Sequence, residues 1–439
     1  MSNKKYLALL HRGVEDWNKW KKSNLHVQLD LKGFNLSNLV LIGIDFTGVD
    51  LSGVNFVKSN LCGANLDGAN LTAANLTEAN LSGASLTGAN LTGAILVHAN
   101  YRSAELGGAN LSLANLAYAD FRAIDLTAAE LSNANFSHAN LNGAVFIGAK
   151  LIRANFELAS LSRADFTDAN LTQTRFNKAD LTHANLDKAD LTSANLTEAN
   201  LQQASLFKAD LTDANLSQAN LTSANFLKSD LTQACFTEAN LTRTDLIQAN
   251  LTRADLSQAN LTQANLSRAH LVQSQAWTTN FDRSILTGAC VENLHINHQT
   301  SFEKVVCKYL YLNYYQKQRI PEDSDHFLTP DEFKSILENL LGSVSMIFDA
   351  DTDWSIFLDA FKKLQLHYKS QRIAIKAMEV LPNQKLIVKI NVTPGLKADA
   401  IKSYLLDRYN SIYLAKNALT ISPSNKNKLR KAPKVYEQN

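Results

Sequence analysis

Large apolar residues recur at every fifth position from about residue 29 to about residue 296. The stretch GANLTEANLSGASLTGANLT is typical, with Leu or Phe at the centre, Ala usually two positions before it, and polar residues elsewhere. A period of five matches neither the period of a helix nor that of a strand. The pattern predicts a chain that makes a short extended run and then a corner every five residues, as in a stacked repeat architecture.

The outward positions carry a second, longer period. Three sets of residues recur every 20 positions: Lys188, Lys208 and Lys228; Asp190, Asp210 and Asp230; Phe207, Leu227 and Ile247. Twenty residues are four pentapeptides, so we expect a four-sided coil. About 54 pentapeptides then make about 13 coils, roughly 65 Å long at the ~4.8 Å spacing of neighbouring strands.

Proline and glycine mark the edges of the repeat region, for which we predict the bounds 29–296. All 6 prolines lie at or after Pro321, and 13 of the 17 glycines lie between Gly33 and Gly148. The absence of proline agrees with a region whose backbone N–H groups are needed for bonds between coils.

Residues 1–28 form a predicted amphipathic helix. Leu7, Leu10, Val14 and Trp17 are spaced to lie on one helical face, with charged residues between them. A stacked solenoid exposes an open end, so this helix is predicted to cap the first coil; the alternative is an ordinary surface helix.

Residues 302–416 leave the five-residue period and predict a small α+β domain. The expected elements are a strand at 302–315, a helix from Pro330 to about Phe348, a helix at 354–368, strands at 373–380 and 385–392 joined by a turn at 381–384, and a helix from Ala398 to about Leu414. Thr329 and Glu332 predict a capping box at the start of the first helix. The tail, 417–439, is polar and basic and is predicted to be disordered.

Candidate metal sites are weak. The acidic run from Asp349 to Asp353 opens like a calcium loop, but Trp354 stands where glycine is needed, and Ala360 where glutamate is needed. His295 and His298 have no obvious third ligand. His98 and His138 share a face but lie two coils apart, roughly 10 Å, which is too far to share an ion. We therefore predict no metal and no cofactor.

Catalytic motifs are missing too. The sequence contains no glycine-rich phosphate loop, no nucleophile elbow and no kinase motif set. The repeat itself accounts for most Asp residues, because they occupy its Asn/Asp position. We predict that the protein is not an enzyme.

Bulk properties favour a cytoplasmic protein. The formal net charge is +2, which gives the whole chain no strong attraction to nucleic acid. The 4 cysteines are scattered without paired spacing, as expected for reduced thiols in a cytosolic protein; an extracytoplasmic protein with unpaired cysteines is the alternative. No run approaches the ~20 apolar residues of a membrane span.

Two surface features of the repeat region are candidate sites. The rows Lys188, Lys208, Lys228 and Asp190, Asp210, Asp230 lie two residues apart across a corner, so we expect an ion-paired corner; the alternative is a phosphate-binding strip. Phe207, Leu227 and Ile247 stand where Thr or Ser is usual, and we interpret them as a candidate partner contact. Scattered surface hydrophobes would need no such explanation.

The two halves of the repeat region differ at the last position of the pentapeptide. Up to Gly148 this position is often Gly or Ala, whereas beyond it Gln, Lys, Arg and Glu dominate. The smooth first half is either a face that packs against another shaft or a series of corners that require a positive φ.

The repeat ANLTEANLSGASLTGANL resembles the A(D/N)LXX motif of bacterial pentapeptide-repeat proteins. The resemblance covers about 29–296 and implies a right-handed quadrilateral β-helix. The segment GVEDWNKWKKSN is similar to the leader of many cyanobacterial members. The region after residue 302 resembles a C-terminal domain that accompanies such repeats in cyanobacterial proteins. This resemblance implies no activity.

The leading functional hypothesis is a non-catalytic protein–protein interaction scaffold, a rigid rod that presents a C-terminal module to an unknown protein partner. Because some members of the family imitate duplex DNA to protect a topoisomerase, DNA mimicry is one alternative. The repeat region, however, has 24 acidic and 16 basic side chains, and the lysine row interrupts any negative stripe. Nucleic-acid binding through the basic tail is the other alternative. Both a monomer and a homodimer are compatible with the sequence.

Overall fold

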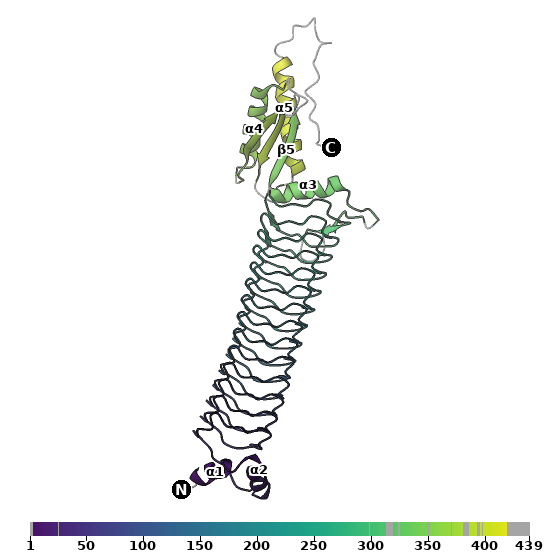
Figure 1. The fold of residues 1–439 in the computed structure, drawn as a ribbon. Helices are drawn as coiled ribbons and strands as arrows, with labels where there is room; N and C mark the ends of the chain where they lie inside the picture. The colour runs from purple at the N-terminus through teal and green to yellow at the C-terminus, as the bar shows by residue number, and fades with distance from the viewer. Residues whose placement is uncertain are drawn as a thin grey trace. The chain divides into compact units, whose positions relative to one another are not determined.

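The structure is a computed structural model of the full chain, and its coils and C-terminal elements are drawn in Figure 1. It describes residues 3–24, 26–297, 299–312, 319–323, 325–348, 352–369, 371–380, 386–392, 396 and 398–418. The chain divides into two compact units. The first holds Met1–Glu292, Gln299–Val306 and Leu310–Arg319, and the second holds Asn293–His298, Cys307–Tyr309 and Ile320–Asn439.

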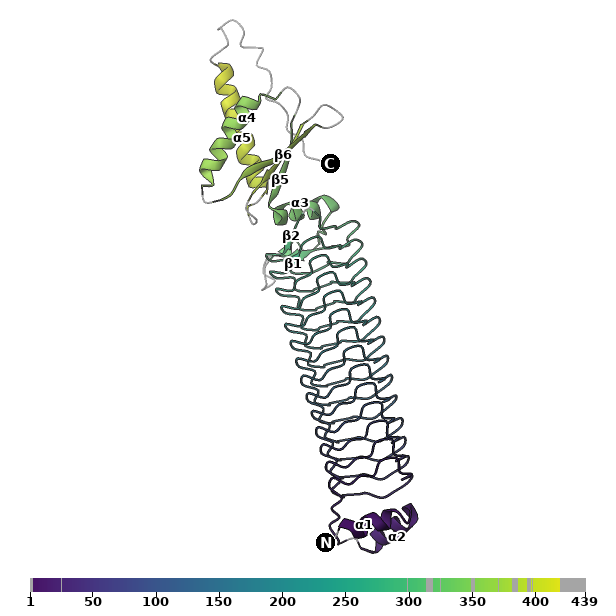
Figure 2. The same cartoon turned by 60° about the vertical axis from the view of Figure 1, so that its left-hand side comes forward.

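The first unit is a stack of coils, each 20 residues long over most of its length. Parallel bridges join residues 20 positions apart, from Asp30 with Asp50 to His270 with Cys290. Three backbone N–H groups of each pentapeptide bond to a neighbouring coil, as in Leu36 to Asn55, Asn38 to Val57 and Asn55 to Phe34. The central Leu or Phe and the Ala two positions before it are buried. The predicted 20-residue period is therefore the period of the coil. Figure 2 shows the coils stacked one on another.

Every corner turns at the same position of the pentapeptide. The residue two after the central Leu has a positive φ, whether it is glycine, as Gly63 at 62°, or not, as Gln203 at 57°. The following N–H donates to the carbonyl of the central residue, as Ala64 does to Leu61 at 3.0 Å. A positive φ at only the second central residue is the geometry of a type II turn. The glycines of the first half thus occupy corner positions with a positive φ, a conformation that costs glycine less than any residue with a Cβ.

Gly107 and Gly108 offer a matched test of the assignment of the corner position. A Cβ at either position would meet nothing within 4 Å, but only Gly108 has a positive φ, of 65°. We expect Gly107→Ala to raise the free energy of unfolding by about 0.4–1 kcal/mol, because alanine restricts the unfolded chain. Gly108→Ala should lower it by about 1 kcal/mol. Denaturant titration of both variants measures the difference, and equal effects would contradict the corner geometry.

The Asn/Asp position supports the stack through its side chains. The Oδ1 atom of Asn70 accepts from the N–H of Thr72 (3.2 Å), while its Nδ2 group donates to Asp50 in the preceding coil (3.0 Å). Asn155 donates to Asn135 (3.0 Å), which donates to Asn115 (3.1 Å), in the same way. These residues therefore serve the fold, which is what the sequence pattern indicates.

The end of the stack departs from the prediction. The bridges beyond residue 290 join residues 21 positions apart, as Asn280 with Ser301 and Cys290 with Tyr311. The 20-residue period predicted for residues 29–296 therefore gives way to a 21-residue period in this last coil, which closes beyond residue 296. The strand expected at 302–315 is wrong over its described part, because Ser301 and Val306 form single bridges and only β3 (Leu310–Tyr311) is a strand. Residues 313–315 lie outside the described residues.

Two helices precede the coils, where one was expected. They are α1 (Asn3–Leu10) and α2 (Val14–Ser23), and the chain breaks between them at Gly13, whose φ is 116°. Trp17 is fully buried, its Nε1–H donates to the carbonyl of Asp45 (2.8 Å), and its ring meets Phe46 edge-on. The apolar stripe of the sequence thus reaches the first coils of the stack.

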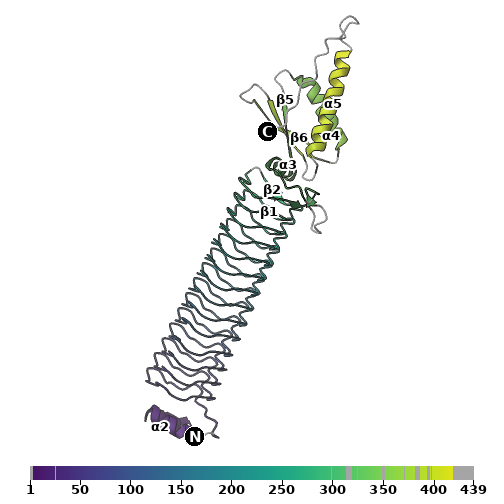
Figure 3. The same ribbon diagram turned by 90° about the vertical axis from the view of Figure 1, so that its right-hand side faces the viewer.

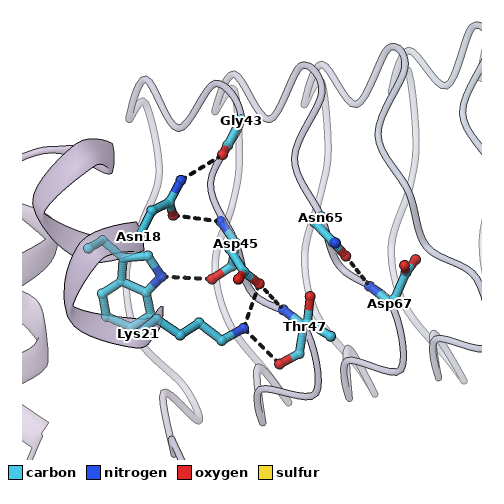
Figure 4. A network of polar contacts seen from close by, with 8 residues as sticks. Asn18, Lys21, Gly43, Asp45, Thr47, Asn65 and Asp67 are labelled. Atoms are coloured by element: carbon cyan, nitrogen blue, oxygen red, sulfur yellow. Dashed lines mark hydrogen bonds and ion pairs between the residues drawn. The ribbon is translucent and has the colours of Figure 1, made fainter. Parts of the chain in front are cut away.

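Polar side chains of α2 complete this contact (Figure 4). Lys21 Nζ donates to Asp45 Oδ1 (2.7 Å) and to the Thr47 carbonyl (2.8 Å). Asn18 donates to the Gly43 carbonyl (3.0 Å) and accepts from the Asp45 N–H (2.9 Å). Burial alone would raise the pKa of Asp45, but the hydrogen bonds from Lys21 and Thr47 outweigh it and hold that pKa below its usual value.

The second unit contains a three-stranded antiparallel sheet in the order β5-β7-β6. Its strands are β5 (Ser343–Phe348), β6 (Ala374–Val380) and β7 (Leu386–Asn391), and α4 (Trp354–His367) and α5 (Ala398–Ala418) lie together beside it (Figure 3). Alternate residues of β5, Val344, Met346 and Phe348, are buried in a core shared with both helices. The second unit also holds α3 (Pro330–Leu341) and β2 (His295–Ile296). Of the chain's remaining strands, β1 (Gln275–Ala276) belongs to the first unit, and the division between the units falls within β4 (Arg319–Ile320).

Most predicted elements of this unit exist, but β5 stands where the end of a helix was predicted. The capping box is confirmed, since the Thr329 N–H donates to Glu332 (2.7 Å) and the Glu332 N–H to Thr329 Oγ1 (3.3 Å). The helix does not run to Phe348, however. It ends at Leu341, and Gly342, with a φ of 59°, leads into β5. The turn at 381–384 lies outside the described residues.

Candidate interaction face

Phe207, Leu227 and Ile247 lie one coil apart in a single row, which we call the ridge. Each occupies the position directly after a central Leu or Phe, and each is half-buried. Their backbone N–H groups are fixed by the repeat: that of Phe207 donates to Asp187 (3.0 Å), that of Leu227 to Asn225 (3.0 Å), and that of Ile247 to Asp245 (2.9 Å). The coil therefore positions three apolar side chains where the repeat usually places Thr or Ser.

The lysine row runs along the ridge, because backbone bonds place the two rows side by side. The N–H groups of Lys188, Lys208 and Lys228 donate to the carbonyls of Phe207, Leu227 and Ile247 in the next coil, at 2.9–3.0 Å. All three lysines are exposed corner residues with φ between 56° and 61°. The Nζ of Lys208 lies 5.1 Å from the centre of the Phe207 ring, within reach of a cation–π contact.

The aspartate row meets threonines rather than lysines. Asp190, Asp210 and Asp230 each accept from the N–H of the threonine two residues later, at 2.9–3.0 Å. Asp190 also accepts from Thr172 (3.0 Å). Burial alone would raise the pKa of Asp190, but the hydrogen bonds from Thr192 and Thr172 outweigh burial and hold that pKa below its usual value. Among the described residues no ion pair joins the two rows.

The metal candidates find no support in the described part of the chain, where no group of three or more potential ligands could hold an ion. His298 and residues 349–351 lie outside it. Asp353 is the N-cap of α4 and accepts from the Ser355 and Ile356 N–H groups. His98 and His138 are separated by Tyr118, whose ring stacks on His138 at 4.6 Å and lies 5.2 Å from His98. Sequence reasoning missed this stack.

None of the described helices is both long and apolar enough to cross a membrane. The disordered tail predicted at 417–439 is wrong at its first two residues, which belong to α5, and the rest of it, from residue 419 onward, lies outside the described residues.

Comparison with known families explains the coil. The profile described as Pentapeptide repeats (8 copies) matches overlapping stretches that run without a break from residue 30 to residue 293. The chain is a pentapeptide-repeat protein. Its coils are accordingly those of a right-handed β-helix. A comparison with curated proteins finds no match.

Solved structures of other pentapeptide-repeat proteins are similar to this one. HetL of the cyanobacterium Nostoc sp. strain PCC 7120, described as involved in heterocyst differentiation regulation, is 30% identical over 54% of this chain and 89% of its own, with a TM-score of 0.29. Rfr23 of Cyanothece 51142 is 33% identical over 21% of this chain and 59% of its own, with a TM-score of 0.18. QnrB1, a plasmid-mediated fluoroquinolone resistance protein, is 19% identical over 45% and 87%, with a TM-score of 0.18.

Proposed function

We propose that this pentapeptide-repeat protein is a non-catalytic protein–protein interaction scaffold, whose β-helix offers the ridge and the lysine row to a protein partner. The partner presents an acidic segment with apolar side chains. The observation that carries the proposal is the register of the two rows, since backbone bonds fix three apolar side chains beside three exposed lysines over four successive coils.

The lysine row has no acidic partners in the part of the chain that the structure describes, and this indicates the chemistry of the protein that would bind there. The neighbouring aspartate row is bonded to threonines, and no ion pair to Lys188, Lys208 or Lys228 occurs among the described residues. Like charges at about one strand spacing repel each other, so an acidic partner would relieve that repulsion. Its apolar side chains would cover the ridge and exclude water from the ion pairs.

Replacing Phe207, Leu227 and Ile247 together by Ser should abolish retention of the partner from extracts of the source cells. The fold should persist, because Ser is a usual residue at this position of the repeat. Ile147→Ser is the matched control: Ile147 lies in the same row and is 38% exposed, but Gly148 rather than lysine follows it. Affinity capture compares the proteins retained by the wild-type, triple and control chains. Equal retention by all three would refute the contact.

The finer architecture belongs to the same proposal. We infer a four-sided rod of about 13 coils, with α1 and α2 as its N-terminal cap and an α+β module over 302–416 that the rod presents. Support for the cap comes from the buried Trp17 and the Lys21–Asp45 pair, which cover the first coils.

DNA mimicry is a weaker candidate, because the exposed lysine row interrupts the negative surface that imitation of duplex requires. Binding of nucleic acid through the tail predicts an affinity that falls steeply with salt and depends on residues 422–439.

A further inference from the structure

A second surface, on a different row from the ridge, has an unusual order of charges. One corner row consists of residues spaced by one coil, each with a positive φ, and we call it the stacked row: Lys58, Glu78, His98, Tyr118, His138, Leu158, Lys178 and Glu198. Lys58 pairs with Glu78, and Lys178 with Glu198, both at 3.6 Å. Four residues that are neither Lys, Arg, Asp nor Glu separate the two ion pairs.

The middle of the stacked row is aromatic and exposed. His98, Tyr118 and His138 form a continuous ring stack, and Tyr118 and Leu158 are 52% and 43% exposed. The same face also carries Leu113, which is 63% exposed, and Ile95, which is 41% exposed. In this region the face consists of the segments 93–98, 113–118 and 133–138 from three successive coils, and these segments contain no Asp, Glu, Lys or Arg. A contiguous apolar patch bordered by charges is typical of a protein interface.

We propose that this face binds a second copy of the chain in antiparallel orientation. From Lys58 to Glu198 the charges read plus, minus, four neutral residues, plus, minus. Reversing this order and laying it on the original places Lys58 opposite Glu198 of the second copy, and Glu78 opposite Lys178 of the second copy. A parallel copy of the row would set lysine against lysine.

The apolar middle fits the same register. With the twofold axis between the coils of Tyr118 and His138, each Tyr118 faces His138 of the second copy, and each His98 faces Leu158. At each end of the interface, one ion pair of each copy lies against an ion pair of the other. The four residues there alternate in sign, so that every positive charge has two negative neighbours. The charged neighbours of the face have partners within the chain: Arg175 pairs with Glu157 at 2.9 Å, and Arg153 donates to Gln173 at 2.8 Å.

The expected dimer is weak. Seven coil steps span about 34 Å, and a face of about four residues is roughly 13 Å wide, so about 450 Å² of each copy is covered. A standard interface covers about 800 Å² of each partner. We therefore expect a monomer–dimer equilibrium that shifts with protein concentration and weakens as salt screens the charged ends.

Sedimentation of the full-length protein over a range of concentrations tests the interface. Wild-type chains should dimerise reversibly, and Tyr118→Ser should raise the dissociation constant at least about tenfold by removing the central ring. Ile42→Ser is the control, because Ile42 is equally exposed (51%) but lies on another row. A wild-type protein that is monomeric throughout, or a dimer unaffected by Tyr118→Ser, would overturn the proposal.

Charge reversal tests the antiparallel register. Glu78→Lys or Lys178→Glu alone places like charges opposite each other and should weaken the dimer at least about tenfold. Mixing the two variants should restore a dimer, because the reversed residue of each chain then faces its complement. Glu130→Lys is the control: it breaks the Lys150–Glu130 pair (2.6 Å) on another side of the coil and should leave dimerisation unchanged. Failure of the mixture to dimerise would exclude this register.

Discussion

Phe156→Ala should destabilise the shaft by about 3–5 kcal/mol, the loss expected when a large buried aromatic side chain leaves a cavity. Phe156 is fully buried and lies in the middle of an interior stack. Its ring stacks at 4.9 Å on Phe136 in one neighbouring coil and on Phe176 in the other. It also meets the edges of Phe146 and Phe166 at 5.8 and 5.9 Å.

The position of the cavity has a further consequence. A solenoid is stable through contacts between adjacent coils, so a weak coil in the middle uncouples the two halves. Hydrogen exchange should therefore show loss of protection centred on the coils around residue 156, and denaturant unfolding should become less cooperative. Ile147→Ala, at a partly exposed site nearby, should change stability by less than about 1 kcal/mol. Equal losses for both variants would contradict the interior stack.

Trp17→Ala should detach α1 and α2 from the first coils, at a cost of about 3–5 kcal/mol to that contact. The substitution removes a fully buried ring and the bond from its Nε1–H to Asp45. Backbone groups of the first coil would become open to water, so hydrogen exchange there should accelerate while the middle of the shaft keeps its protection. Trp20→Ala in the same helix is the control, because Trp20 is only partly buried. Unchanged exchange in the first coil would argue against a capping role.

The pH dependence of this contact has a defined sign. The pKa of Asp45 is lowered in the folded chain, because bonds from Lys21 and Thr47 outweigh its burial. A lowered pKa contributes stability that is present above the ordinary pKa of aspartate and is lost as pH falls through the depressed value. Acidification should therefore release α2 before it affects the apolar interior. In Trp17→Ala this acid sensitivity should be weaker, because the Lys21–Asp45 pair is no longer held in place.

Much of the shaft could be predicted from the sequence, because the repeat couples one apolar residue to one corner every five positions. The buried Leu and Ala positions and the 20-residue coil follow directly from that period. The extra residue of the last coil could not be predicted, because nothing in the sequence at 297–300 indicates that the coil lengthens there. The end of α3 had a signal that was overlooked: Gly342, followed by the alternating apolar residues of Val344, Met346 and Phe348.

The surface was harder to predict, because side chains have several possible partners. Lys and Asp two residues apart suggested ion pairs, yet each aspartate in the row is followed two residues later by a threonine that donates to it. The recurring motif ADLT or SDLT carried that information. The stack of His98, Tyr118 and His138 becomes visible only when the corner position is read at intervals of 20.

The claim that the ridge is the partner contact can be tested most directly by cross-linking in the source cells. A photo-reactive amino acid is placed in the full-length chain at position 207, at position 227, or at the control position 147. We expect covalent adducts with one and the same acidic protein from 207 and 227, and none with that protein from 147. Adducts that are identical at all three positions, or absent at 207 and 227, would contradict the scaffold and its contact face.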